Sequence, residues 1–318
     1  MKFLRRIGFA FFTLLMAAGA QAQTYPSRSV RIVVPFGAGS ITDSLARILA
    51  ERLTGMWAQS VVVENRPGPP GANSVANSTP DGYTLMLTST GHVIAKAISK
   101  TISFDPVTDF TGVIQVANVP QVLAVAQDLP VKSLKEFIDA ARAKPGAFNY
   151  SSAGVASSSF LLGEVLRQAA DIKMVHVPFK SASEAVTALL RGDVQMYFMP
   201  ILDAVELGAA NKVRVIAIGS GKRVSQLPDV PTIAEAGLPS FQYEGWFGVL
   251  APAQTPRPII DRVNTDIATL LRSDDVSGRL LRQGAIPAPN SPAEFDAIIK
   301  ADAERYTRII AAAGITAN

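Results

Sequence analysis

Two stretches of the sequence run from an apolar strand, through a loop of small residues, into a helix. In the first, Val30–Val34 leads into the loop Pro35–Asp43, and in the second, Phe148–Tyr150 leads into the serine-rich loop Ser151–Ser159. Small side chains let a ligand approach the backbone closely, and the helix beyond each loop offers unpaired N–H groups and the positive end of its dipole. Two such loops, far apart in the chain, predict two lobes that hold one small anion between them.

The first lobe is predicted from alternating strand and helix patterns. We expect strands at Ser29–Val34, Ser60–Glu64 and Thr84–Leu87, with helices at Thr42–Leu53 and near Asn73–Asn77. This βαβαβ order is typical of an α/β fold with a mostly parallel sheet flanked by helices.

The same pattern continues further along the chain. Ser133 begins a helix that reaches Arg142, and Glu136 completes a capping box with it. The remaining expected elements are strands at Phe148–Tyr150, Val175–Val177, Val194–Phe198 and Val213–Ile218, and helices at Phe160–Gln168, Ser183–Leu190, Pro258–Arg272 and Ser291–Ala313. The chain therefore predicts a second α/β lobe of similar construction.

Residues 110–125 break the alternation, because they form a long β-rich stretch without a helix. We interpret this stretch as the crossover between lobes, with a return near Tyr243–Leu250. The predicted boundaries are residues 23–118 plus 246–318 for lobe 1 and residues 119–245 for lobe 2.

The N-terminus has the three parts of a secretory signal peptide. Its basic part contains Lys2, Arg5 and Arg6. Residues 7–18 form an apolar run that is short for a bilayer span, and Ala20-Gln21-Ala22 is a small-residue cleavage signal. We expect residues 1–22 to be removed and the mature protein to be periplasmic and to begin near Gln23. An uncleaved membrane anchor is the alternative.

Composition excludes several classes of function. Removing the three cations of the leader takes the formal charge from +4 to +1, so the mature surface has no large basic field and we expect no nucleic-acid partner. The chain has no cysteine, which excludes disulfides and thiolate chemistry. Neither His92 nor His176 lies in a metal-type spacing, so we expect no metal and no cofactor.

The serine-rich loop raises the question of a nucleophile. No Gly-x-Ser-x-Gly elbow surrounds its serines, and turn formation and helix capping explain them equally well. Asp43, at the start of a helix, is expected to accept backbone N–H bonds and stiffen its loop, because a carboxylate would repel an anionic ligand. His92 follows a strand end, where ligands bind in open α/β sheets.

Short segments distributed over nearly the whole mature chain carry a family resemblance. They are Tyr25-Pro26-Ser27-Arg28, Val33-Val34-Pro35-Phe36 with Gly39 and Thr42-Asp43, Val61-Val62-Val63-Glu64-Asn65-Arg66-Pro67-Gly68, Pro80-Asp81-Gly82-Tyr83-Thr84-Leu85, Phe104-Asp105-Pro106, Ser152-Ala153-Gly154, Val175-His176-Val177-Pro178-Phe179-Lys180, Leu227-Pro228-Asp229-Val230-Pro231-Thr232, Glu235-Ala236-Gly237-Leu238-Pro239 and Trp246-Phe247-Gly248 with Leu250-Ala251-Pro252. With these segments the chain resembles the periplasmic receptors of tripartite tricarboxylate transporters, often called Bug-type solute-binding proteins.

The resemblance implies a two-lobed periplasmic binding-protein fold, type II-like, with a ligand cleft at the hinge. It also implies that the two loops converge on a ligand carboxylate. Carried onto this chain, the implied ligand-binding residues are Phe36, Gly39, Ser40, Thr42, Asp43, Thr88, Ser89, Thr90, Ser152, Ala153, Gly154, Ala156, Ser157, Ser158, Phe179 and Met199. Whether His92 or Lys180 also touches the ligand stays open.

The chain departs from the family pattern at several positions. The usual double glycine of the first loop is Gly39-Ser40, and the common Asn-Pro-x-Leu-Tyr after the third strand is Ala95–Ser99. Phe160 replaces a frequent histidine, and Met199 replaces a frequent aspartate. These changes make the expected pocket less polar, so we expect an aromatic or medium-chain carboxylate to bind more tightly than citrate.

The expected function is a monomeric periplasmic receptor that captures a small organic carboxylate, aromatic or dicarboxylic, and delivers it to the membrane subunits of a tripartite tricarboxylate transporter. No reaction is expected. Two alternatives remain: a ligand sensor for a two-component signalling system, and a periplasmic hydrolase that uses one of the serines.

Overall fold

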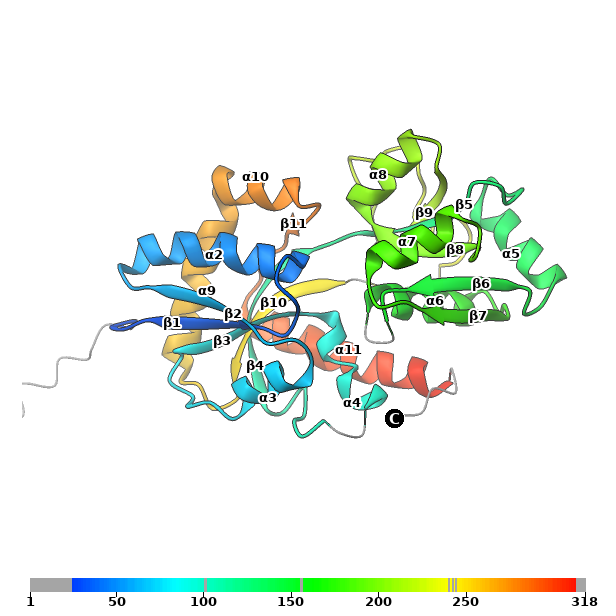
Figure 1. Cartoon of the computed structure of the whole chain (residues 1–318). Helices are drawn as coiled ribbons and strands as arrows, with labels where there is room; N and C mark the ends of the chain where they lie inside the picture. The colour runs from blue at the N-terminus through cyan, green and yellow to red at the C-terminus, as the bar shows by residue number, and fades with distance from the viewer. Residues whose placement is uncertain are drawn as a thin grey trace, which may run out of the picture.

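The computed structural model describes residues 25–99, 102–154, 157–239, 241, 243 and 245–312. Two lobes, each a sheet flanked by helices, lie side by side (Figure 1). The predicted signal peptide, residues 1–22, and the predicted start at Gln23 lie outside the described residues. Within the described ranges, no helix has the length and apolar character needed to cross a membrane.

The sheet of lobe 1 has six strands in the order β11-β4-β10-β3-β1-β2. They are β1 (Val30–Val34), β2 (Val61–Asn65), β3 (Thr84–Ser89), β4 (Phe110–Asn118), β10 (Trp246–Pro252) and β11 (Ile286–Pro287). β1 pairs with β2 and β3 in parallel, whereas β10 pairs antiparallel with β3 and β4. The carboxyl ends of β1, β2 and β3 therefore share one edge of the sheet.

Helices cover both faces of this sheet, because an inner strand, β1, is apolar on both sides. Ile32 and Val34 are buried against α2 and α9, whereas Val33 is buried against α3. In α2, Leu45, Leu49 and other apolar residues recur at helical spacing and are fully buried. The helical elements of lobe 1 are α2 (Ile41–Trp57), α3 (Pro69–Ala76), the 3₁₀ turn η1 (Thr90–His92), α4 (Ala95–Ile98), α9 (Arg257–Arg272), α10 (Asp274–Arg282) and α11 (Pro292–Ala312).

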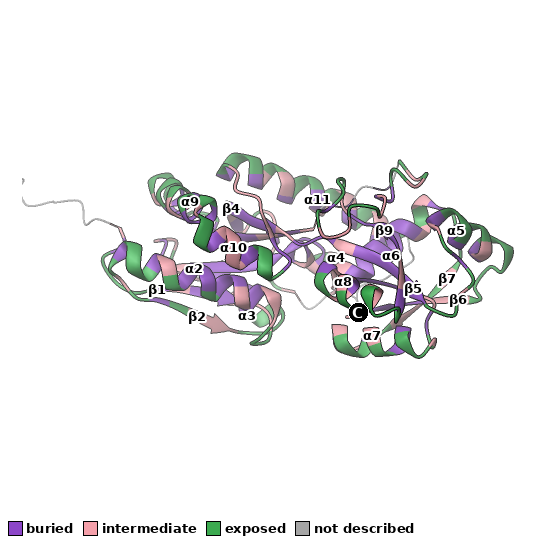
Figure 2. Ribbon diagram, turned by 90° about the horizontal axis from the view of Figure 1, so that it is seen from above, coloured by how far each residue is buried: buried purple, intermediate pink, exposed green. Residues whose placement is uncertain are grey.

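Lobe 2 is built in the same way around a five-stranded sheet, in the order β7-β6-β8-β5-β9. Its strands are β5 (Gln121–Ala126), β6 (Phe148–Ser152), β7 (Met174–Pro178), β8 (Met196–Pro200) and β9 (Val213–Ile218), and its helices are α5 (Leu134–Ala143), α6 (Ser158–Ala169), α7 (Ala182–Leu190) and α8 (Ile201–Ala209). Figure 2 shows the inner strands and the inner sides of the helices mostly buried, with exposed residues on the outer sides of the helices, whereas the edge strands β2 and β7 are largely not buried.

The predicted two-lobed α/β fold is confirmed, and both sheets are mixed where we expected mostly parallel ones. The antiparallel strands include β4, β5 and β10, which lie next to the two passages of the chain between the sheets. Helices α8 and α10 and the short strand β11 were not predicted. Both helices are short, and α10 begins with the charged pair Asp274 and Asp275.

The two lobes share part of their apolar core. Helix α11 packs on β4 of lobe 1 and also contacts α6 of lobe 2. Trp246 at the start of β10 packs edge-on against Phe295 of α11, with ring centroids 5.1 Å apart. Tyr306 of α11 belongs to the same buried cluster as Leu162 of α6. The lobes are therefore joined by a packed helix as well as by the crossing strands.

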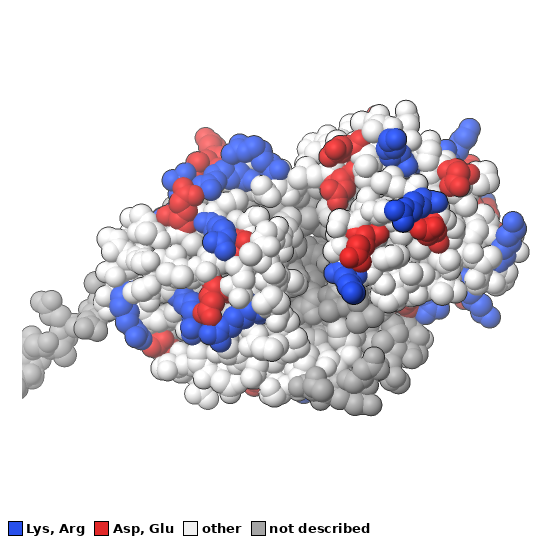
Figure 3. Space-filling view, in the orientation of Figure 1, with Lys and Arg blue, Asp and Glu red and all other residues white. Residues whose placement is uncertain are grey.

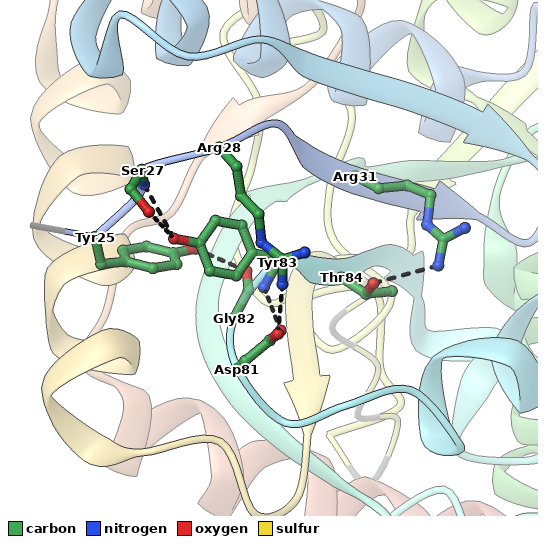
Figure 4. A network of polar contacts seen from close by, with 8 residues as sticks. All are labelled: Tyr25, Ser27, Arg28, Arg31, Asp81, Gly82, Tyr83 and Thr84. Carbon is green, nitrogen blue, oxygen red and sulfur yellow. Dashed lines mark hydrogen bonds and ion pairs between the residues drawn. The ribbon is translucent and has the colours of Figure 1, made fainter. Parts of the chain in front are cut away.

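At the amino-terminal end of the parallel strands β1 and β3, a network of polar contacts holds two chain segments together (Figure 4). The Tyr25 hydroxyl donates to the Gly82 carbonyl (2.7 Å), and Arg28 pairs with Asp81 (2.8 Å). The Arg28 guanidinium also lies over the ring of Tyr83, 4.2 Å from its centroid. These contacts fasten the segment before β1 to the turn before β3, away from the edge where the small-residue loop begins.

Gly248 of β10 is predicted to tolerate no side chain, because a Cβ there would overlap the ring of Phe295 and lie 3.0 Å from the Ile114 carbonyl oxygen. We expect Gly248→Ala to lower the free energy of unfolding by about 1–3 kcal/mol. In the matched control Gly278→Ala, the nearest atom is the Arg282 Nη1 at 3.6 Å. Because Gly278 lies inside α10, this change is expected to stabilise by about 0.5–1 kcal/mol. Urea denaturation measures the free energy of unfolding of both variants. Equal changes in the two variants would contradict the close packing of Gly248 against Phe295.

Candidate ligand-binding site

The first loop, which joins β1 to α2, is held in shape by Asp43. The Ser40 Oγ accepts a hydrogen bond from the Asp43 amide (3.2 Å), which caps the helix. In return, Asp43 Oδ2 accepts from the Gly39 amide (2.9 Å), and Gly39 has a φ of +81° that favours glycine. Asn65, at the end of β2, donates to Asp43 Oδ1 (3.0 Å) and to the Phe36 carbonyl (3.3 Å). The loop is thus tied to the neighbouring strand.

Asp43 supports the loop, and both oxygens of its carboxylate accept hydrogen bonds from the protein itself. Its side chain is buried, and Oδ2 also accepts from Arg47 Nε (3.0 Å). Burial alone would raise the pKa of Asp43, but the hydrogen bonds from Arg47, Gly39 and Asn65 outweigh burial and hold the pKa below its ordinary value. This geometry fits the expectation from the sequence that Asp43 stiffens its loop. It does not fit the implication of the resemblance that Asp43 binds the ligand.

Two amides at the start of α2 remain available to an anion. Among the described residues, nothing accepts a hydrogen bond from the N–H of Ile41 or of Thr42. The first N–H groups of a helix have no partner within the helix, and the helix dipole makes this end positive. The first loop therefore offers backbone donors and carries no cation between Pro35 and Thr42.

The second loop, between β6 and α6, is organised by its own serines. Ser157 caps α6, since its Oγ accepts from the Phe160 amide (3.2 Å) and donates to the Gly154 carbonyl (2.6 Å). The Ser159 Oγ accepts from the Ala153 amide (3.2 Å). Gly154 has a φ of +102°, which a larger residue adopts only with strain. The hydroxyls of Ser157 and Ser159 thus shape the loop, as the capping interpretation predicted.

Ser152 and His176 form a close pair, with 2.7 Å between Oγ and Nε2. Such a distance also suits a nucleophile and its base. However, Ser152 is fully buried, and no carboxylate among the described residues hydrogen-bonds to the His176 ring. Glu164 instead accepts hydrogen bonds from Tyr150 and from Arg167. Burial lowers the pKa of His176, which therefore stays neutral and anchors the loop to β7.

The end of β3 contacts the start of β10, where the chain returns from lobe 2 to lobe 1. Thr90 is fully buried, and its Oγ1 accepts from the Trp246 amide (2.8 Å). The Tyr243 hydroxyl lies beside the side chains of Thr90 and Ser158, is buried, and has no well-aligned hydrogen bond within the described part of the chain. Burial raises the pKa of Tyr243, so the phenol stays protonated. Sequence reasoning missed Tyr243, because nothing local marks a residue whose neighbours come from both lobes.

Several residues that we expected at the ligand site have side chains that pack away from it. Met199 is fully buried in the core of lobe 2, and Phe160 is fully buried against His176, with ring centroids 4.9 Å apart. Phe179 is half-buried and lines a separate depression beside α7. Phe160 and Met199 therefore do not form the less polar pocket that we expected from them, because their side chains are buried within lobe 2. Ala156 lies outside the described residues.

An apolar pocket of about 150 Å³ lies beside the first loop in lobe 1. Phe36 from the loop and Thr88 from the end of β3 both line it. His92 forms part of its lining, with the ring stacked on Phe104 at 5.7 Å and Nε2 placed 3.1 Å from the Pro106 carbonyl. Burial lowers the pKa of His92 to about 4, so this histidine is neutral. Sequence reasoning pointed to Phe36, Thr88 and His92 but not to their shared pocket.

The molecular surface is hollowed between the two lobes (Figure 3). The loop from β1 to α2 lies at the side of lobe 1 that faces lobe 2 (Figure 1). No group of acidic, histidine or cysteine side chains in the described ranges could hold a metal ion. What the arrangement offers is backbone donors at a helix start, small hydroxyls and one apolar pocket, which suit the binding of a small anion with an apolar part.

Replacing Asp43 is expected to loosen the first loop. We predict that Asp43→Ala lowers the free energy of unfolding by about 1–3 kcal/mol at neutral pH, because three donors lose a buried acceptor. The folded-state pKa is lowered, so this contribution is complete above the unfolded pKa near 4 and disappears as pH falls through the folded pKa.

Urea denaturation between pH 7 and pH 3 should therefore show the difference between wild type and Asp43→Ala shrinking on acidification. Asp139→Ala serves as the control, because its exposed pair with Lys135 is worth less than about 0.5 kcal/mol. A difference between wild type and Asp43→Ala that does not depend on pH would contradict the role given to the Asp43 carboxylate.

The fold of the chain is similar to those of several solved structures. The chain is similar to R. palustris Rpa4515 with adipate, at 34% identity and a TM-score of 0.80 over 92% of this chain and 100% of that one. It is also similar to MatC from Rhodopseudomonas palustris with bound malate, at 31% identity and a TM-score of 0.76 over 90% of this chain and 100% of that one.

Sequence comparison agrees with the structural one. The chain is 34% identical to the protein BugT of Bordetella pertussis over 98% of both chains. It is 33% identical to a UPF0065 protein of Pseudomonas sp. (strain P51), over 99% of this chain and 96% of that protein. Residues 45–315 match the model of the tripartite tricarboxylate transporter family receptor. The chain belongs to the tripartite tricarboxylate transporter receptor family, the periplasmic solute-binding proteins that its sequence resembles.

Proposed function

We propose that this protein is a periplasmic receptor that captures a small organic carboxylate and delivers it to the membrane subunits of a tripartite transporter. The observation that carries the proposal is the available helix start of α2, at the side of lobe 1 that faces lobe 2. In the proposed mature protein, which begins near Gln23 and acts as a monomer, lobe 1 comprises residues 23–118 plus 246–318 and lobe 2 comprises residues 119–245.

The carboxylate is held by neutral donors in this proposal. The amides of Ile41 and Thr42 point along the axis of α2, whose positive end favours a negative charge. Ser158, at the start of α6, offers a second helix start from lobe 2. Lys180 is exposed, and its amide donates to Glu184 (3.1 Å) as part of the start of α7. A cation is therefore not required to hold the carboxylate.

Binding is coupled to the relative position of the lobes. A ligand that contacts donors from both lobes binds better when the lobes are close, so it shifts the population toward the closed form. The closed form is then the one that the membrane subunits distinguish from the empty receptor. Two related structures, one with adipate and one with bound malate, support a carboxylate as the ligand.

The first test is a thermal-shift screen with adipate, malate, benzoate and citrate. At least one should raise the melting temperature, because a ligand that binds only the native state stabilises it by about 2.7 kcal/mol at a hundredfold excess over Kd. The same ligand should reduce the radius of gyration in small-angle scattering. Failure of all four carboxylates, with glucose as the uncharged control, would count against the proposed ligand class.

The second test asks whether neutral donors hold the carboxylate. Ser40→Leu places a bulky side chain beside the open amides of α2, and Gly154→Val places one in the second loop at a positive φ. For the panel member that stabilises wild type most, calorimetry should show both variants losing about 1.5–3 kcal/mol of binding free energy, whereas Lys180→Met loses much less.

Ser133→Leu is the matched control for Ser40→Leu, because Ser133 caps α5 through the Glu136 amide (3.2 Å) in the same way. Ser133→Leu should lower the free energy of unfolding without changing the affinity for the ligand. Abolished binding in Lys180→Met alone would show that a cation dominates and would refute the account of helix starts.

A further inference from the structure

The apolar pocket beside the first loop has the size of one aromatic ring. Its volume is about 150 Å³, and an engineered apolar cavity of about 150 Å³ in another protein binds benzene. Ala72 of α3 and Ala95 and Ile98 of α4 form part of its walls, and Ile102 and Phe104 contribute others. The pocket therefore has room for a compact hydrocarbon group.

The lining excludes a second charge from the body of the ligand. None of the residues that line the pocket is acidic or basic at neutral pH, since His92 is neutral there. The His92 ring stacks on Phe104 and meets Phe110 edge-on, with centroids 4.8 Å apart, so it acts as an aromatic wall. An ionised carboxylate in this pocket would lose its hydration without gaining a cation.

The pocket borders the first loop, which leads into the start of α2. Phe36 lies in the first loop, whose helix begins at Ile41, and the same Phe36 side chain lines the pocket together with Thr88. A planar ring in the pocket with a substituent on the edge nearest Phe36 would place that substituent at this loop. A carboxyl group attached directly to an aromatic ring has that shape.

We propose that the pocket of Phe36, Ala72, Ala95, Ile98 and Phe104 takes the ring of a benzoate-type carboxylate, with its carboxyl group at the start of α2. This inference rests on the proposed function for the carboxyl half of the ligand. It adds a separate subsite in lobe 1 that selects the body of the ligand and disfavours short hydroxy acids with a second charge.

The test fills the pocket without touching the first loop. Ala95→Leu adds three carbons at a lining position of α4, and Ala97→Leu makes the same change on the same helix at a residue that does not line the pocket. By calorimetry, wild type should bind benzoate more tightly than malate. Ala95→Leu should weaken benzoate binding by about tenfold or more and leave malate within twofold, and Ala97→Leu should change neither.

Two further measurements keep the test independent of folding and of the carboxylate. If Ala95→Leu does not fold, Ile98→Ala enlarges the pocket and should move the preference from benzoate to 4-methylbenzoate. Fluorobenzene has no carboxylate, so broadening of its fluorine NMR signal by wild type but not by Ala95→Leu tests the pocket alone.

The outcomes separate the two proposals. Binding of fluorobenzene without binding of any carboxylate would support the pocket and reject the proposed function. Tighter binding of malate than of benzoate by wild type, or equal benzoate affinity in wild type and Ala95→Leu, would overturn the benzoate subsite and leave the carboxylate receptor standing. No broadening of fluorobenzene by wild type would also overturn the subsite.

Discussion

The buried carboxylate of Asp43 holds the first loop of lobe 1 in shape, and the proposed binding site depends on that shape. It accepts hydrogen bonds from Gly39, Arg47 and Asn65, and so fixes a loop that is otherwise made of small residues with little packing of their own. A flexible loop would have to lose backbone entropy of about 1–2 kcal/mol per residue when it closes on a ligand. With the loop fixed by Asp43, the open amides at the start of α2 are ordered before the ligand arrives.

The two lobes hold their small-residue loops in shape with different side chains. Lobe 1 uses a carboxylate and an asparagine to hold its loop, whereas lobe 2 uses hydroxyls, with Ser152 bonded to His176 and Ser157 capping α6. Between them, Trp246 ties the end of β3 to α11 through Thr90 and Phe295. Neither loop carries a cation, and in the function proposed here the neighbouring pocket, which has no cation either, selects the body of the ligand.

The sequence predicted the elements that depend on local patterns. Alternating strands and helices, the cap at Ser133 and the small-residue loops all appear in the structure close to their expected positions. Mixed sheets were missed, because strand direction is set by the path of the crossover and not by composition. Met199 was assigned to the site from the family resemblance, but its side chain packs in the core of lobe 2. Tyr243 and the pocket at Ile98 could not be predicted, because each is assembled from residues far apart in the chain.

The central claim is that one carboxylate engages helix starts in both lobes at once. Amide chemical-shift mapping of the isotopically labelled mature protein, titrated with benzoate and with adipate, tests it most directly. The account predicts the largest proton shifts, toward higher frequency, at Ile41 and Thr42 of α2 and at Ser158 of α6, with the same concentration dependence in both lobes. Shifts confined to one lobe, or centred on cationic side chains such as Lys180, would contradict it.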